Sequence, residues 1–391
     1  MKSYLTHLEC TACGKTHPHA QAIRTCPDCG KVLFARYDLP KARREITPKA
    51  FQGRGNSMWR FFELMPVLNE RNVVSLGEGG TPLLKAERLG KKLGLKNLYL
   101  KDEGLNPTGS FKARGLSAAV SKAKEVGQMR VTIPTAGNAG GALAAYAARG
   151  GLESYVFMPK DAPDANKIEC QVLGSNLNLV DGLISDAGRI SQEKAKKEGL
   201  FDLSTLREPY RAEGKKTMAL ELAIDLGWRA PDAIIYPTGG GTGIVGMHKA
   251  FNELRELGWI DSPQPKFVSI QAEGCQPLVK AYREGADKAE PYPNAHTLAS
   301  GLRVPGVFAD YIILKVLRET GGTALPVPDR DMVAAMKELG AAEGVFACPE
   351  GAATLAGLKQ LLKQNFFKGD ETIILMNTGS GLKYLDVLNA H

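Results

Sequence analysis

The segment "LNPTGSFKARG", Leu105–Gly115, decides how the chain is interpreted, because it places a lysine at the start of a helix. Ser110 is a residue type typical of helix N-caps, and the apolar spacing after it predicts a helix. Lys112 would then lie in the first turn, where the helix dipole disfavours a positive charge. Such a position suits a lysine that loses its proton and attacks a carbonyl group better than it suits a structural lysine.

Length and composition indicate a globular protein. The chain has 391 residues, of which 43% are hydrophobic, so we expect two or three domains. The sequence predicts neither a signal segment nor an apolar run long enough to cross a membrane, so the expected location is the cytoplasm. The net charge of +8 is scattered among acidic residues, which favours small anionic ligands over nucleic acid.

Two CxxC pairs near the N-terminus predict a zinc ribbon. They are "CTAC" and "CPDC", and each is followed by a glycine and a lysine. Four thiolates at this spacing suit one Zn²⁺ in a structural site, and disulfides are the alternative. The predicted metal ligands are Cys10, Cys13, Cys26 and Cys29. The remaining cysteines, Cys170, Cys275 and Cys348, are expected to be buried small residues.

After the ribbon, short β-rich runs alternate with amphipathic stretches, which is typical of α/β folds with parallel sheets. The predicted strands are "NLYLKDE", "RVTIPTAG", "SYVFMPK", "NLNLVDG", "DAIIYPTGG", "KFVSIQAEG" and "TIILMNTG". Ligands of such folds bind where strands end and glycine-rich turns enter helices.

The loop "PTGGGTGIVG", residues 237–246, has the composition of a phosphate site. Its glycines let backbone N–H groups approach an anion at a helix N-terminus. Gly241, Gly243 and Gly246 also match the GxGxxG pattern of nicotinamide cofactor sites. A phosphate-binding loop is therefore predicted, but the pattern does not identify the ligand that carries the phosphate.

Two further strand-end loops are candidates. "PTAGNAGG" places Asn138 at the start of a helix rich in small residues, where it is either a plain N-cap or a ligand contact. "NTGSGLKY" places Thr378 and Ser380 beside glycines after the last predicted strand.

Together these motifs resemble the fold type II pyridoxal-phosphate enzymes, and within them the threonine synthase-like branch. "PTGSFKARG", "TAGNAG", "GGGTG" and "TGSG" occur in the family's order between Gly77 and Tyr384. The resemblance implies two three-layer α/β/α domains with mainly parallel sheets, plus the N-terminal zinc ribbon. It implies Lys112 as the catalytic residue that also holds pyridoxal 5'-phosphate. The other implied cofactor-binding residues are Asn138, Gly239, Gly240, Gly241, Thr242, Gly243 and Thr378.

The resemblance also implies a substrate site and a reaction. The implied substrate-binding residues are Thr135, Ala136, Gly137, Ala139 and Arg211. "GEGGTPLL", "LKDEGLNPTGSFK" and "EPYRAEGKKT" resemble threonine synthases, which implies a carbon–oxygen lyase acting on O-phospho-L-homoserine. Ala113 and Leu206 depart from the family pattern, at an aspartate and at a polar position ahead of the arginine.

Several alternatives remain open at this stage. A threonine or serine ammonia-lyase and a phosphoserine-type β-replacement enzyme would share the first chemical steps. A nicotinamide-dependent oxidoreductase and a zinc-ribbon scaffold with an inactive enzyme fold are candidates from other classes.

The expected organisation has three parts and small-molecule partners. Residues 1–37 form the ribbon, residues 38–101 and 206–391 a larger cofactor-binding domain, and residues 102–205 a smaller mobile domain. The expected partners are a phosphorylated amino-acid substrate and a second copy in a homodimer, without nucleic acid or membrane.

Overall fold

In the computed structural model, which describes residues 1–389, the chain folds into two compact units. Unit 1 comprises Met1–Gly80, Lys112–Glu221 and Gly246–Asp261. Unit 2 comprises Thr81–Phe111, Leu222–Val245 and the chain from Ser262 onwards. The three-part division expected from the sequence is a different partition and stays a prediction. Among the described residues, each helix is either too short or too polar to cross a membrane.

The N-terminal ribbon of unit 1 is a three-stranded antiparallel sheet in the order β2-β1-β3. Its strands are β1 (Leu5–Cys10), β2 (Thr16–His17) and β3 (Leu33–Tyr37), followed by α1 (Leu39–Glu45). Gly14 and Gly30 both have φ of +71°, a conformation that favours glycine. Their N–H groups donate to the carbonyl oxygens of Cys10 and Cys26, which closes the two tight turns.

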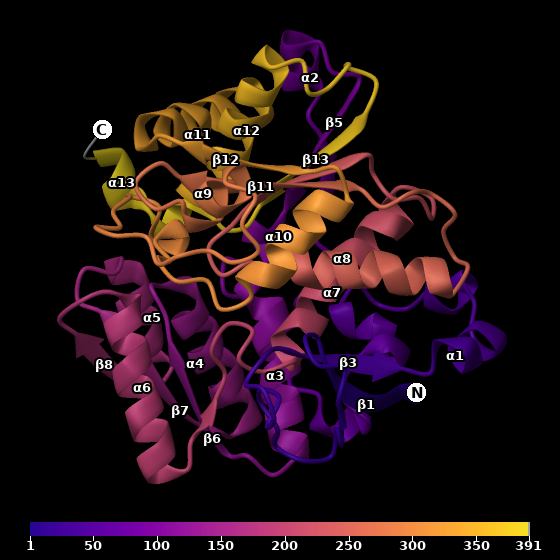
Figure 1. The fold of residues 1–391 in the computed structure, drawn as a ribbon, viewed down its shortest axis with the longest axis vertical. Helices are drawn as coiled ribbons and strands as arrows, with labels where there is room; N and C mark the ends of the chain where they lie inside the picture. The colour runs from indigo at the N-terminus through magenta and orange to yellow at the C-terminus, as the bar shows by residue number, and fades with distance from the viewer. Residues whose placement is uncertain (390–391) are drawn as a thin grey trace. The chain divides into compact units, whose positions relative to one another are not determined.

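The second sheet of unit 1 is parallel, in the order β8-β7-β6-β9. Its strands are β6 (Arg130–Pro134), β7 (Glu153–Pro159), β8 (Asn176–Val180) and β9 (Phe201–Asp202). The helices around it are α3 (Lys112–Glu125), α4 (Asn138–Gly150), α5 (Asp164–Val172), α6 (Ile184–Glu198) and α7 (Tyr210–Asp225). Both α4 and α6 pack on β6 and β7, with α6 in front of the strands in Figure 1 and α4 behind them.

Unit 2 contains a six-stranded sheet in the order β12-β11-β10-β13-β5-β4, parallel except for β4. Its strands are β4 (Leu83–Lys85), β5 (Asn97–Asp102), β10 (Ala233–Pro237), β11 (Lys266–Ala272), β12 (Thr323–Val327) and β13 (Thr372–Asn377). Its helices include α2 (Glu87–Leu93), α9 (Pro277–Arg283), α10 (Asp310–Glu319), α11 (Asp329–Glu343), α12 (Pro349–Lys363) and α13 (Leu385–Asn389). The helix α8 (Thr242–Glu256) begins in unit 2 and continues into unit 1.

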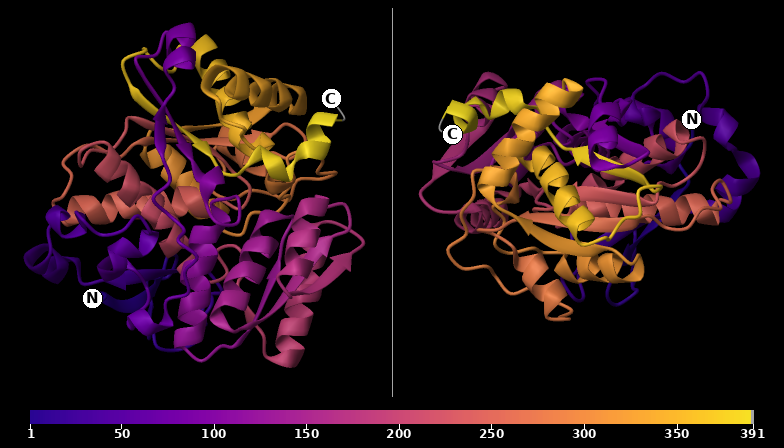
Figure 2. Two further views of the ribbon diagram at one scale, coloured as in Figure 1. Left: turned by 180° about the vertical axis from the view of Figure 1, so that it is seen from behind. Right: turned by 90° about the horizontal axis from the view of Figure 1, so that it is seen from above.

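The core of unit 2 forms where α12 packs on β10 and β13. Buried Ile, Leu and Ala side chains of these elements belong to one apolar cluster, and this burial is the main driving force for folding. Figure 2 shows β5 and β13 side by side, although they lie far apart in the sequence. This arrangement brings the carboxyl ends of β5, β13 and β10 to one edge of the sheet.

The seven strands predicted from the sequence all form, and the predicted α/β class with parallel sheets is confirmed. The sequence did not predict β12, which contains Pro326. Proline cannot donate a ladder hydrogen bond and is tolerated at the edge of a sheet. β12 is such an edge strand, because it pairs with β11 alone.

Candidate active site and metal centre

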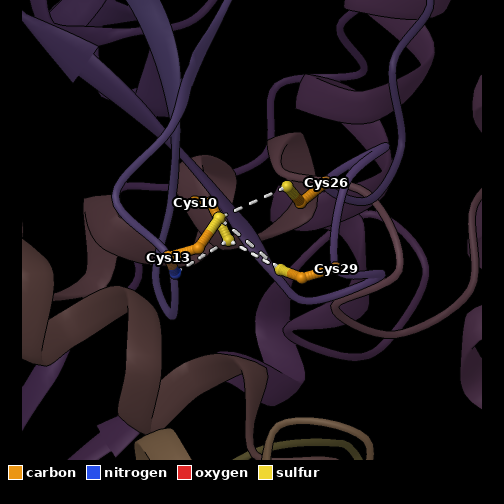
Figure 3. A group of neighbouring side chains, drawn as sticks. All are labelled: Cys10, Cys13, Cys26 and Cys29. Carbon is orange, nitrogen blue, oxygen red and sulfur yellow. Dashed lines mark hydrogen bonds between the residues drawn. The ribbon is translucent and has the colours of Figure 1, made fainter.

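The four ribbon cysteines come together as predicted. Figure 3 shows their side chains converging, and their Sγ atoms all lie within 4.8 Å of one another. The Sγ atom of Cys13 is 3.8 Å from that of Cys26 and 3.7 Å from that of Cys29, and Cys10 lies 3.4 Å from Cys29. Four sulfurs at the usual Zn–S distance in a tetrahedron would be about 3.8 Å apart. The donor set and its spacing therefore fit a structural zinc ion, and all four cysteines are free rather than joined in disulfides.

Lys112 is the first residue of α3. Ser110 forms an isolated β-bridge with Gly379, and α3 begins two residues later; the role of Ser110 as N-cap stays a prediction. The N–H group of Phe111 donates to the carbonyl oxygen of Thr378 at 3.0 Å. The residues immediately before Lys112 are thus held by the loop that follows β13.

The asparagine loop lies between β6 and α4 in unit 1, with Asn138 as the first residue of α4. Thr135 is buried, and its Oγ1 atom accepts the N–H of Gly137 at 3.0 Å. A β-carbon on Gly140 would lie 2.9 Å from side-chain atoms of Thr135 and Val156. The small residues therefore let α4 pack closely on its sheet, and they leave residues 135–139 at the helix N-terminus, a favourable place for a carboxylate.

The glycine loop joins β10 to the N-terminus of α8 in unit 2. Gly241 has φ of +75°, and a β-carbon on Gly239 would lie 2.2 Å from the carbonyl oxygen of Gly301. A loop of this shape, closed tightly by its neighbours and opening a fifteen-residue helix, fits a phosphate group.

Tight packing explains why two positions of the GxGxxG pattern are glycine, without a nicotinamide cofactor. A β-carbon on Gly243 would lie 2.2 Å from the hydroxyl oxygen of Tyr236. One on Gly246 would lie 2.6 Å from the carbonyl oxygen of Ala212 in α7. Both positions are small because a neighbouring group fills the space.

Thr378 follows β13, next to the strand that carries the glycine loop. It is buried, and its Oγ1 atom is 3.8 Å from the Sγ atom of Cys348. The Nδ2 atom of Asn377 donates to Asp102 at 2.7 Å, and burial raises the pKa of that carboxyl. Burial also raises the pKa of the Cys348 thiol well above its usual range, so this cysteine is a neutral neighbour of Thr378.

Arg211 and Lys215 lie one turn apart in α7, and both side chains are fully buried. A β-carbon on Gly115 would lie 3.2 Å from the carbonyl oxygen of Arg211 and 3.2 Å from Cε of Lys215. Gly115 is one helical turn after Lys112 in α3. The close packing of the two helices therefore places the side chain of Lys215 and the backbone of Arg211 beside the first turn of α3.

A buried ion pair fixes α3 against α7. The two terminal nitrogens of Arg114 each lie 2.7 Å from an oxygen of Glu221, which also accepts the N–H of Gly80 at 2.8 Å. Both side chains are buried, so each charge depends on the other for compensation.

Sequence reasoning missed two buried carboxyl groups in unit 1. Glu78 accepts hydrogen bonds from Trp59, Ser117 and Tyr146 at 2.9, 2.6 and 2.7 Å. It thereby ties the segment "GEGG" to α3 and α4. Glu208 accepts the backbone N–H groups of Tyr210 and Arg211 at the start of α7, and burial raises its pKa to about 7. A glutamate followed by proline ahead of a helix is a capping signal that could have identified Glu208.

The predicted residues divide between the two units. Lys112, Thr135 to Ala139 and Arg211 belong to unit 1. The glycine loop from Gly239 to Gly243 and Thr378 belong to unit 2, where they follow neighbouring parallel strands.

Comparisons with known proteins identify the family of the chain. Residues 74–379 match the family model described as pyridoxal-phosphate dependent enzyme. A threonine synthase of Methanocaldococcus jannaschii is 38% identical over 96% of this chain and 92% of its own length. A threonine synthase of Methanosarcina acetivorans is 37% identical with the same coverage.

Solved structures share the fold at lower identity. Maize serine racemase superposes with a TM-score of 0.69 and 22% identity over 79% of this chain and 91% of its own. Threonine deaminase isoform 2 from Solanum lycopersicum gives a TM-score of 0.67 and 23% identity, covering 79% and 87% of the two chains. The family match decides for pyridoxal phosphate over a nicotinamide cofactor. The chain belongs to the family of pyridoxal-phosphate-dependent enzymes, and its nearly full-length relatives there are threonine synthases.

Proposed function

We propose that the chain is a threonine synthase that converts O-phospho-L-homoserine and water to L-threonine and phosphate. The observation that carries the proposal is the similarity to threonine synthases over 96% of the chain, at 37–38% identity. The buried Arg211 and Lys215 of α7 are its candidate phosphate ligands. A guanidinium or ammonium group can bind a phosphate through charge-assisted hydrogen bonds. The phosphate group of the substrate carries the negative charge that such cations bind. Threonine and serine, the ammonia-lyase substrates, have no phosphate group.

Leu206 departs from the family pattern, and Arg211 and Lys215 could compensate for the phosphate contact that it cannot make. It is buried and stands where the family pattern has a polar residue. Its side chain offers no hydrogen bond to a phosphate, so Arg211 and Lys215 would carry that contact. Arg211 would contribute two parallel charge-assisted hydrogen bonds and Lys215 a point charge.

The remaining residues take the roles that their positions support. The glycine loop and the first turn of α8 would bind the phosphate of the cofactor, and Thr378 would meet its ring nitrogen. Asn138 would contact the ring oxygen, and Thr135 with the N–H groups through Ala139 would hold the substrate carboxylate. Bound pyridoxal phosphate supplies an electron sink for the electrons of the α-carbon.

Lys112 would move the protons. Its Nζ atom would accept the proton of the substrate α-carbon and return a proton after water has added at the β-carbon. The dipole of α3 disfavours a charged amine at its first residue, which favours the basic form that this step needs. A proton leaves the β-carbon as the γ-carbon–oxygen bond breaks, so phosphate leaves with the bridging oxygen. The γ-carbon gains a proton before water adds at the β-carbon.

The test is phosphate and threonine release from O-phospho-L-homoserine, run beside keto-acid formation from threonine and serine. Arg211→Ala should lower kcat/KM for the phosphorylated substrate by about thirtyfold. Lys337→Ala, a change at an exposed residue of α11 in the other unit, is the control and should leave kcat/KM unchanged. Keto-acid formation without phosphate release would reject the proposal. A homodimer, a cytoplasmic location and a mobile smaller domain stay predictions.

A further inference from the structure

The zinc ribbon contacts the segment that precedes Arg211. The Nη1 atom of Arg24, which lies between the two CxxC pairs, is 3.3 Å from Oδ2 of Asp202 at the end of β9. Arg24 is 44% exposed, whereas the Asp202 side chain is 1% exposed. A buried carboxylate is stabilised by nearby cations. The ribbon supplies one of them, Arg24, and Arg207 also interacts electrostatically with Asp202.

Asp202 organises the loop that leads into α7. Its Oδ1 atom accepts the N–H of Ser204 at 2.9 Å and also the Ser204 hydroxyl. Later in this loop, Leu206 has φ of +57°, a left-handed conformation that is unfavourable for leucine. Glu208 fixes the far end by capping α7. The loop is thus held in an unfavourable conformation by a buried acid at each end.

The guanidinium group of Arg211 rests on this loop. Its Nη1 atom donates to the carbonyl oxygen of Leu203 at 2.8 Å and to Oγ1 of Thr205 at 3.3 Å. Movement of the loop would therefore move or release the guanidinium group.

The ribbon also contacts α7 directly. The hydroxyl of Tyr37, the last residue of β3, donates to Glu213 at 2.8 Å. The Nζ atom of Lys216 lies 4.0 Å from the centre of the Tyr37 ring and 2.7 Å from Glu213. Glu213 lies two residues after Arg211, so the ribbon fixes α7 on one side of Arg211 and the loop on the other.

We propose that the zinc ribbon is a positioning element for the substrate site, and that Arg24 is its positioning residue. By compensating buried Asp202, Arg24 holds the loop that orients the Arg211 guanidinium group for phosphate. The inference rests on the proposed function of Arg211 as a phosphate ligand. The role of zinc in this inference is limited to holding the two CxxC turns on either side of the segment that carries Arg24.

The variants are chosen to separate positioning from general stability. Arg24→Ala removes the compensating charge, and adding Asp202→Asn removes the carboxylate that needs it. Arg36→Ala is the matched control, because Arg36 is 39% exposed and its ion pair at 2.7 Å joins it to Glu9 inside the ribbon. Each is studied as the full-length holoenzyme.

Two readouts are measured. The first is hydrogen exchange of the backbone amides of residues 203–208, which needs no turnover. The second is the separate measurement of KM and kcat for O-phospho-L-homoserine. In Arg24→Ala we expect faster exchange in this loop and a KM raised by about threefold to tenfold, with kcat within about twofold and cofactor absorbance unchanged. Addition of Asp202→Asn should bring KM part of the way back toward the wild-type value. Arg36→Ala should have the KM and the loop exchange of the wild type.

The outcomes separate the inference from the proposed function. Loop exchange and KM in Arg24→Ala that equal those of Arg36→Ala would overturn the inference. If the wild type releases no phosphate, the proposed function fails. Faster hydrogen exchange of the loop in Arg24→Ala, but not in Arg36→Ala, would still show that the ribbon holds this loop. If Arg24→Ala lowers kcat in proportion to a loss of bound cofactor, the inference would also be overturned, because this result would indicate general destabilisation.

Discussion

The backbone of Gly239 lies directly against the carbonyl oxygen of Gly301, so that a β-carbon on Gly239 would be 2.2 Å from that oxygen. Gly301 is itself held, because its N–H donates to Glu350 at 2.7 Å, and Glu350 also accepts the hydroxyl of Tyr384 at 3.0 Å. The glycine loop therefore packs against a fixed neighbour, and its shape depends on the absence of a side chain at Gly239.

Gly239→Ala should weaken cofactor binding while the fold persists. The added methyl group cannot be accommodated without displacing the loop, so we expect the Kd for pyridoxal phosphate to rise about tenfold or more. Equilibrium titration of the apoenzyme with pyridoxal phosphate measures it. Gly306→Ala, where a β-carbon meets nothing within 4 Å, is the control and should bind as the wild type does. Equal affinities in the two variants would show that this loop is not the phosphate site.

Lys112→Ala should abolish the yellow colour of the purified protein. Since the amine that holds the cofactor is then missing, the visible absorbance band should be absent while far-UV circular dichroism is unchanged. Lys124→Ala, on the last turn of the same helix, should keep the band. Colour in the Lys112→Ala protein that survives dialysis, and that borohydride bleaches while leaving the cofactor covalently attached, would indicate another lysine.

Removal of the metal should leave the cofactor in place. Wild type should contain one zinc per chain, and Cys26→Ser should lose it, because three thiolates hold zinc less tightly than four. Metal analysis and cofactor absorbance of the same sample test this. Cys170→Ser, at a buried cysteine outside the cluster, should keep its zinc. Loss of both zinc and pyridoxal phosphate from Cys26→Ser would contradict a purely structural metal.

Glu208 should make stability depend on pH. Burial raises its pKa from 4.5 to about 7, opposed by Arg211 and reinforced by Asp202. Between those values the folded protein keeps a proton that the unfolded chain has lost, so stability falls as pH rises and is level above about pH 7. The decline is on the order of 3 kcal/mol.

Urea unfolding of Glu208→Gln at about pH 5 and about pH 8 tests this, because glutamine cannot titrate and this part of the decline should disappear. The exposed Glu193→Gln is the control and should keep the wild-type dependence. An unchanged pH dependence in Glu208→Gln would show that this carboxyl titrates normally.

The strands and ligand loops could be predicted because their signals are local. "RVTIP" and "DAIIYP" are β-rich runs that end in glycine turns, and both became parallel strands that lead into helices. The four cysteines were predictable for the same reason, since their spacing alone fixes the donor set.

The features that sequence reasoning missed depend on tertiary burial. Glu78 is an ordinary acid in the sequence, and its role arises because the fold encloses it with donors from other elements. The hydrogen bonds of Glu208 are local, but its raised pKa comes from burial. The isolated β-bridge of Ser110 with Gly379 was also missed, because its two residues lie far apart in the sequence. The contact of Arg24 with Asp202 joins residues 178 positions apart, which no local pattern predicts.

The most direct test of threonine synthase activity is the reaction in water labelled with ¹⁸O, with both products analysed by mass spectrometry. Because the γ-carbon–oxygen bond breaks and water adds at the β-carbon, threonine should gain one ¹⁸O atom in its hydroxyl group and the phosphate should gain none. Labelled phosphate with unlabelled homoserine would mean cleavage at phosphorus, and keto acid without threonine would mean elimination alone; either result would contradict the assignment.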